Sequence, residues 1–178
     1  MKLISMNIMG VGEALKRIIC TISLMGVTTI LEGEWRIGEA LQITIVNMYN
    51  AGPLTDKRVV WEEVREKRRT QNTKALCVVE DFNSIRRSRE KRNVGNGDDH
   101  KREVRRFNDF IENSELVDIP MVGRKYTQYK PNGLIKIKID QILVSREWLD
   151  KWSDSKCHIL DKLMFDHCAL VLKTDITD

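Results

Sequence analysis

Long apolar runs are absent from this sequence of 178 residues. The longest run is far shorter than the roughly 20 residues that a membrane-spanning helix needs, so the sequence predicts no transmembrane segment. The first ten residues, MKLISMNIMG, also lack the extended apolar stretch of a secretory signal peptide. Both absences favour an intracellular protein of the nucleus or the cytoplasm.

The cysteines lack the close spacing of a metal site. Cys20, Cys77, Cys157 and Cys168 form no CxxC pair and no other metal-ligand pattern. We therefore expect buried, reduced thiols, which suit an intracellular protein.

Internal repeats and linkers are also missing, which predicts a single domain over residues 1–178. A chain of this length buries a sizeable core, and 42% hydrophobic with 31% charged residues is ordinary for a globular protein. Strand-like and helix-like patterns intermingle with hairpin signals. The sequence therefore favours mixed α/β layers over a purely parallel sheet.

Periodicity predicts the individual elements. Strands are expected at 2–8, 41–49, 75–79 and 168–172. Asn132-Gly133 marks a hairpin turn. In the second arm of this hairpin, apolar residues alternate with Lys136 and Lys138, which predicts one buried face and one solvent-exposed face. Apolar residues at helical spacing predict helices over 11–22, after a cap at Thr55 or Asp56, and around Phe107. A stretch punctuated by glycine, 26–38, is left without an element.

Positive charge is concentrated in one segment. The net charge is +4, and residues 86–106 hold nine Lys or Arg against four Asp or Glu. The plainer interpretation is a solvated loop that runs into a helix. The alternative is a strip that faces nucleic-acid phosphates. Its candidate residues are Arg86, Arg87, Arg89, Lys91 and Arg92.

Polar residues stand at or just beyond four apolar runs. They are Asn7, Asp81 with Asn83, Asp140, and Asp166 with His167. Each has an ordinary explanation on its own: a turn, a cap, a structural histidine, or an ion pair of Asp140 with Lys138 or Arg124. Together they suit phosphodiester hydrolysis, which needs an oxygen-ligated divalent ion, a base for the attacking water and a donor to the phosphate.

Several segments resemble, in order, the motifs of the endonuclease/exonuclease/phosphatase superfamily. VEDFN, KIDQILVS and DHCALVL are similar to its GDFN, RLDRxLVS and SDHCPLLL motifs, and ISMNIMGVG and VNMYNAGP to its SWNVRGLG and NVYxP segments. LVDIPMVGRKYTQYKPNG resembles LVDLPxxGRKFTWYRPNG of plant non-LTR retrotransposon endonucleases. The likeness covers nearly the whole chain.

This resemblance implies an α+β fold, a four-layer sandwich of two packed β-sheets flanked by helices. It implies DNA as the substrate, Mg²⁺ or Mn²⁺ as the cofactor, and a reverse transcriptase domain in the same polypeptide as the ancestral partner. It also implies roles for individual residues. Asp81 with Asn83 would activate water, Tyr49 and His167 would contact phosphate, Asp140 would orient His167, and Asn7 and Asp166 would serve the metal.

The chain departs from the family pattern where a QETK-like strand should supply the main metal-ligand glutamate. Residues 26–40 carry no such motif and make the domain internally shortened, with central strands missing. Glu32 and Glu34 lie there in a different context. In addition, Glu80 and Lys138 replace the Gly of the GDFN motif and the Arg of the RLD motif. These departures predict impaired or absent cleavage.

Two other functions compete with an impaired endonuclease. The chain is a non-catalytic nucleic-acid-binding remnant if the basic segment binds DNA without cleavage. Alternatively it is a phosphoesterase for a lipid or small-molecule phosphate, since the superfamily also acts on such esters.

Overall fold

The computed structural model describes nine ranges of the chain: 2–6, 18–22, 29–37, 41–49, 52–70, 75–95, 97–130, 133–160 and 167–174. Its centre is a five-stranded sheet in the order β3-β4-β5-β11-β7. These strands are β3 (Thr29–Ile37), β4 (Leu41–Tyr49), β5 (Ala75–Asp81), β11 (Asp140–Val144) and β7 (Val117–Asp118). The β4–β5 pair is parallel and the other pairs are antiparallel.

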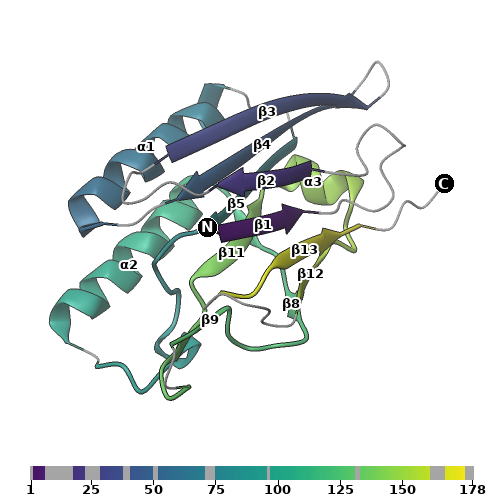
Figure 1. The fold of residues 1–178 in the computed structure, drawn as a ribbon. Coiled ribbons are helices and arrows are strands. Elements are labelled where there is room, and N and C mark those ends of the chain that lie inside the picture. The colour runs from purple at the N-terminus through teal and green to yellow at the C-terminus, as the bar shows by residue number, and fades with distance from the viewer. Residues whose placement is uncertain are drawn as a thin grey trace.

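One face of this sheet is covered by two long helices, α1 (Leu54–Thr70) and α2 (Asp98–Asn113), as Figure 1 shows. Their apolar stripes carry Trp61 and Phe107, whose ring centroids lie 5.4 Å apart, and Phe107 also packs on Phe82. These residues form one buried cluster with the helix-facing side chains of β4, β5 and β11. Both helices confirm the predicted patterns, although α1 begins before the expected caps.

The opposite face packs against a second sheet in the order β13-β12-β8 (Figure 1). It consists of β8 (Met121–Val122), β12 (Lys156–Ile159) and β13 (Leu170–Lys173). The short helix α3 (Arg146–Lys151) adds Trp148, whose ring centroid lies 4.6 Å from that of Trp152 in a tilted arrangement. Both indoles are buried in the cluster between the sheets. Two packed sheets with helices on an outer face confirm the mixed-layer fold.

The N-terminal strands correct one prediction. β1 (Lys2–Met6) pairs antiparallel with β2 (Ile18–Ile22), although the apolar spacing predicted a helix over 11–22. That prediction is wrong for 18–22, where four of the five residues are β-branched and therefore stiff and suited to a strand. Residues 11–17 lie outside the described part of the chain. The stretch 26–38, to which no element was assigned, contains β3.

A further sheet has three short strands in the order β6-β10-β9. They are β6 (Lys91–Arg92), β10 (Lys136–Ile137) and β9 (Gln128–Tyr129). A 3-10 helix (Ser88–Glu90) precedes β6. The β9–β10 pair confirms the predicted hairpin.

Among the described residues, no helix is both long enough and apolar enough to span a bilayer.

Three thiols confirm the prediction for the cysteines. Cys77, Cys157 and Cys168 are free and buried between the two sheets. Burial raises the pKa of the Cys157 thiol to about 12, and burial followed by proximity to Cys157 raises the pKa of Cys77. The side chain of Cys20 is not among those that the structure describes.

A candidate metal centre at the strand ends

The backbone register aligns three of the predicted site residues. Tyr49 at the end of β4 pairs with Asp81 at the end of β5, and Asp81 pairs with Asp140 at the start of β11. Parallel β4 and β5 end at the same edge, and antiparallel β11 begins there. One row of the sheet thus brings together three residues, of which the first and last, Tyr49 and Asp140, are 91 positions apart in the sequence.

His167 completes this row from the loop that precedes β13. Its Nδ1 lies 2.9 Å and 3.1 Å from the two carboxylate oxygens of Asp140. The side chains are 8% and 3% exposed, so this pair is largely shielded from water. Ligand atoms of Asp81, Asp140 and His167 all lie within 4.8 Å of one another. Asp140 therefore pairs with His167, and the simpler pairing with Lys138 or Arg124 that the sequence left open is not what holds it.

Thr127 anchors both halves of this pair. Its hydroxyl oxygen accepts the backbone N–H groups of Ile139 and Asp140 at 3.1 Å and 3.0 Å, and its carbonyl accepts the N–H of Cys168 at 2.7 Å. Thr127 is fully buried. One threonine thus fixes the backbone before Asp140 and the backbone after His167.

Gln128 contacts the other ring nitrogen of His167. Its side-chain amide nitrogen lies 2.8 Å from His167 Nε2, and an isolated β-bridge joins the two residues. Which of the two ring nitrogens donates depends on the tautomer, and each of them lies within hydrogen-bond distance of a partner. The nitrogen that would face a phosphate is therefore engaged by Gln128.

Asn83 occupies a strained turn just beyond β5. Its φ of 44° lies in the left-handed region, which asparagine tolerates better than most residues. Its backbone N–H donates to Asp81 Oδ1 at 3.1 Å, which orients that carboxylate. The turn that the sequence suggested as the ordinary explanation is thus present, and it also fixes a site carboxylate.

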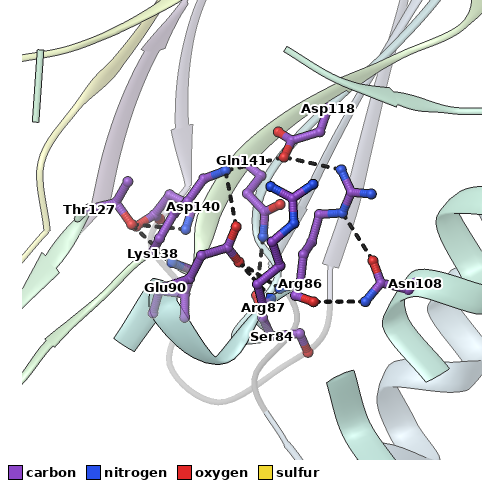
Figure 2. A network of polar contacts seen from close by, with 11 residues as sticks. Ser84, Arg86, Arg87, Glu90, Asn108, Asp118, Thr127, Lys138, Asp140 and Gln141 are labelled. Atoms are coloured by element: carbon purple, nitrogen blue, oxygen red, sulfur yellow. Dashed lines mark hydrogen bonds and ion pairs between the residues drawn. The ribbon is translucent and has the colours of Figure 1, made fainter. Parts of the chain in front are cut away.

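The basic segment divides into inward and outward cations. Arg86 donates to Asn108 at 3.1 Å and to Asp118 at 3.3 Å, and Glu90 accepts the backbone N–H of Arg86 at 2.7 Å (Figure 2). Lys91 is 9% exposed and donates to the Gly95 carbonyl. The remaining three side chains, Arg87, Arg89 and Arg92, are exposed.

Lys138 lies in the same network rather than on a wet face. It approaches Asp118 at 3.2 Å and Glu90 at 3.8 Å with only 12% of its side chain exposed (Figure 2). The predicted alternation of a buried and a wet face is therefore wrong at Lys138. The reason is tertiary, because two carboxylates from distant segments compensate the buried ammonium.

Three predicted site features lie outside the description. Asn7 and Asp166 fall beyond the described residues, and only the backbone of Tyr49 is described. Their assigned roles therefore stay predictions.

Several residues of the site were not singled out from the sequence. Thr127 and Gln128 stand inside the GRKYTQ segment, whose family likeness was a possible signal for them. Lys57 gave no signal, since a lysine on an amphipathic helix normally faces water. Gln141 follows Asp140 directly and donates to the Ser84 carbonyl at 3.2 Å.

The donor set is suited to a hard divalent ion. Two buried carboxylates, Asp81 and Asp140, converge with His167, and Mg²⁺ is commonly held by one or two carboxylates with water completing its shell. Both nitrogens of His167 already have hydrogen-bond partners. The carboxylates, Asp81 above all, are therefore the ligands that fit an ion here.

The two glutamates of β3 are remote from this row in register. Thr29 pairs with Tyr49, whereas Glu32 pairs with Val46 and Glu34 with Thr44. At about 3.3 Å per residue, their backbones stand about 10 Å and 17 Å along the strand from the site row. At this spacing, the backbone of neither glutamate lies in the row that holds Asp81 and Asp140.

Comparison with solved structures shows that this chain shares its fold with known nucleases. The endonuclease domain of TRAS1, a telomere-specific non-LTR retrotransposon, matches with a TM-score of 0.59 and 12% identity over 99% of this chain and 81% of that one. A 3'-5' exonuclease from Neisseria meningitidis matches with a TM-score of 0.57 and 19% identity over 75% of this chain and 61% of that one.

A structure of the Neisseria 3' phosphatase bound to a product DNA hairpin matches with a TM-score of 0.57 and 18% identity, over 75% of this chain and 61% of that one. This chain thus spans about three-fifths of the Neisseria enzyme's length. No protein-family model and no curated protein sequence matches the chain. At these identities the likeness establishes the fold.

Proposed function

We propose that this chain is a metal-dependent DNA endonuclease domain of retrotransposon origin in which cleavage is impaired. The observation that carries the proposal is the convergence of Asp81, Asp140 and His167 within 4.8 Å. This cluster lies at the strand ends of a fold shared with a retrotransposon endonuclease domain and a DNA-processing enzyme. In the ancestral polypeptide a nick would have supplied the primer for an adjoining reverse transcriptase domain.

Each residue of the cluster has a chemical task in phosphodiester hydrolysis. Asp81, whose carboxylate is oriented by the Asn83 N–H, would align the attacking water and accept its proton. Asp140 holds the His167 ring, which would donate to a phosphate oxygen in the form that carries a proton on Nε2. A divalent ion on the carboxylates would stabilise the charge that develops on the phosphate.

Two features support impairment. The glutamates of β3 stand three and five rows from the site row, so neither is placed as the missing metal ligand. The Gln128 amide also occupies His167 Nε2, and a phosphate oxygen must displace it. Loss of a principal metal ligand alone is expected to slow cleavage on the order of a thousandfold or more.

Exposed cations near the site would contact the DNA. Arg87, Arg89 and Arg92 are exposed. In the strand register, Arg92 of β6 stands opposite Lys136 of β10, which stands opposite Tyr129 of β9. The ammonium of Lys136 lies 5.6 Å from the Tyr129 ring centroid. Gln128 precedes Tyr129 and contacts His167, so this cationic row adjoins the site.

The deciding experiment incubates supercoiled plasmid with purified protein and Mg²⁺, beside His167→Ala and an EDTA control. We expect no nicking above the EDTA control from a protein that circular dichroism shows to be folded. We also expect DNA affinity that falls steeply with salt. Nicking that disappears in both controls would show an intact site and contradict impairment.

Other outcomes separate the competing functions. Salt-dependent DNA binding without any Mn²⁺ binding that depends on Asp81 would favour a non-catalytic binding remnant. Hydrolysis of a lipid or small-molecule phosphate ester, lost in His167→Ala, would favour a phosphoesterase of another substrate class.

A further inference from the structure

A buried lysine of α1 supports the turn that follows β5. Lys57 is 4% exposed, and its ammonium donates to the backbone carbonyl of Asn83 at 2.6 Å and to Ser84 Oγ at 3.2 Å. Its third partner is the carboxylate of Glu103 on α2. A lysine ammonium has three N–H donors, and these three contacts can use all of them.

Three elements converge on this turn. Glu103 of α2 also accepts the Ser84 hydroxyl at 2.8 Å, and Gln141 of β11 donates to the Ser84 carbonyl at 3.2 Å. Lys57 adds α1 to the same point. A lysine that only joined α1 to α2 would need Glu103 alone, whereas two of the three contacts of Lys57 go to the turn.

The backbone of Asn83 links Lys57 to Asp81. Asn83 has a φ of 44°, a left-handed conformation that asparagine adopts more readily than most residues. Its N–H holds Asp81 Oδ1 and its carbonyl accepts Lys57. The ammonium therefore fixes the residue whose N–H orients a site carboxylate.

We propose that Lys57 is a positioning residue that holds the turn carrying Asn83 and thereby aims the Asp81 carboxylate. The consequence for metal binding rests on the proposed function, whereas the hold on the turn does not. Lys57 touches neither the water nor the phosphate in this scheme, so its effect travels through the Asn83 backbone. Partners that orient metal ligands commonly change metal affinity tenfold to a hundredfold when removed.

Amide hydrogen exchange on the whole chain tests the hold without metal or substrate. We compare wild type with Lys57→Met, with Lys57→Arg as the conservative variant and Lys101→Met as the control. Lys101 is an exposed lysine of α2 that pairs with Asp98. Lys57→Met is expected to speed exchange in the segment 82–84 on the order of tenfold or more relative to the α1–α2 core. Lys57→Arg should restore most of the protection, and Lys101→Met should change nothing there.

Mn²⁺ titration followed by electron paramagnetic resonance tests the consequence for the site. Lys57→Met is expected to raise the Mn²⁺ dissociation constant on the order of tenfold, and Asp81→Asn should abolish the same binding. If Lys57→Met does not fold, Lys57→Gln takes its place, because glutamine is polar but too short to reach the Asn83 carbonyl.

The outcomes distinguish this proposal from the proposed function. Unchanged exchange at 82–84, or exchange that rises equally throughout the core, overturns the positioning role. Faster exchange with unchanged Asp81-dependent Mn²⁺ affinity also overturns it. Wild type without Asp81-dependent Mn²⁺ binding contradicts the proposed function, while selective exchange at 82–84 still supports the hold of Lys57 on the turn.

Discussion

The hydroxyl oxygen of Thr127 accepts a hydrogen bond from the backbone N–H of Asp140 at 3.0 Å. The same oxygen accepts the N–H of Ile139, and the Thr127 carbonyl accepts the N–H of Cys168 beside His167. Because Thr127 is fully buried, water does not replace these contacts when they are lost. The geometry of the Asp140–His167 pair therefore depends on a residue that performs no chemistry itself.

Thr127→Val keeps the shape of the side chain and removes only the hydroxyl. We expect a loss of about 1–3 kcal/mol in the free energy of unfolding, because two buried N–H donors lose this acceptor. Urea denaturation measures the loss, with Thr55→Val as the control, since the Thr55 hydroxyl bonds only at the exposed surface. Equal stability of Thr127→Val and wild type would contradict the anchoring role.

Gln128→Met retains the length of the side chain and frees His167 Nε2 from the amide. Removing one competing hydrogen bond, about 1 kcal/mol, should tighten binding of inorganic phosphate at the ring about fivefold. Nuclear magnetic resonance of the His167 ring nitrogens during a phosphate titration measures this affinity, and His167→Ala supplies the baseline. An unchanged affinity would show that the amide does not compete with phosphate.

Replacing Arg86 should mainly change the stability of the fold, whereas replacing Arg89 should mainly change the affinity for DNA. Arg86→Met breaks contacts with Asp118 and Asn108 and should destabilise the fold by about 1–3 kcal/mol. Arg89→Met alters an exposed cation and should leave stability within about 0.5 kcal/mol, while lowering DNA affinity and the steepness of its salt dependence. Urea denaturation and fluorescence anisotropy at several salt concentrations separate the two effects. Equal stability losses would contradict the division into inward and outward cations.

His100 should make the protein less stable in mild acid. Burial, followed by repulsion from Lys91, lowers its pKa below the usual 6.5. The unfolded chain therefore binds the proton first, so this contribution is full above pH 6.5 and is lost as pH falls toward the folded pKa.

His100→Gln removes that titration, so its stability should fall less than that of wild type between pH 7.5 and pH 5.5. Urea denaturation at both pH values gives the difference, in which the shared effect of the carboxylates cancels. Identical losses in the two proteins would rule out His100 as a source of acid sensitivity.

The three buried thiols should resist alkylation in the native protein. Burial raises the pKa of Cys77 and Cys157, so little reactive thiolate forms at pH 8, and Cys168 is also buried. Iodoacetamide labelling with peptide mass analysis should find these three cysteines unmodified natively and modified in guanidinium. Native labelling of Cys77 would indicate that the two sheets separate readily.

The two long helices and strands such as β4 and β5 were predictable because each follows a local period in the sequence. The stripe containing Trp61 and the stripe containing Phe107 repeat every three to four residues, and each stripe packs on the sheet as expected. Residues 18–22 show the limit of this signal. Their apolar spacing fits a helix, yet their β-branched side chains and the partner strand β1 produce β2.

The candidate site was predictable as a set of residue types, and its likeness to a nuclease family supplied an order for them. Asp81, Asp140 and His167 each follow or begin an apolar run, which places them at strand ends. Their mutual distances were not predictable, since Asp140 and His167 meet only when the loop before β13 crosses to β11.

By itself, then, the sequence determined the two long helices, strands such as β4 and β5, and the polar groups that stand at strand ends, because those features depend on near neighbours along the chain. Tertiary structure alone decided that Arg86, Lys91 and Lys138 turn inward, that Gln128 engages His167, and that Lys57 supports the Asn83 turn. Burying a charge is favourable only where a compensating partner is brought to it, and here those partners come from segments that only the packed fold unites.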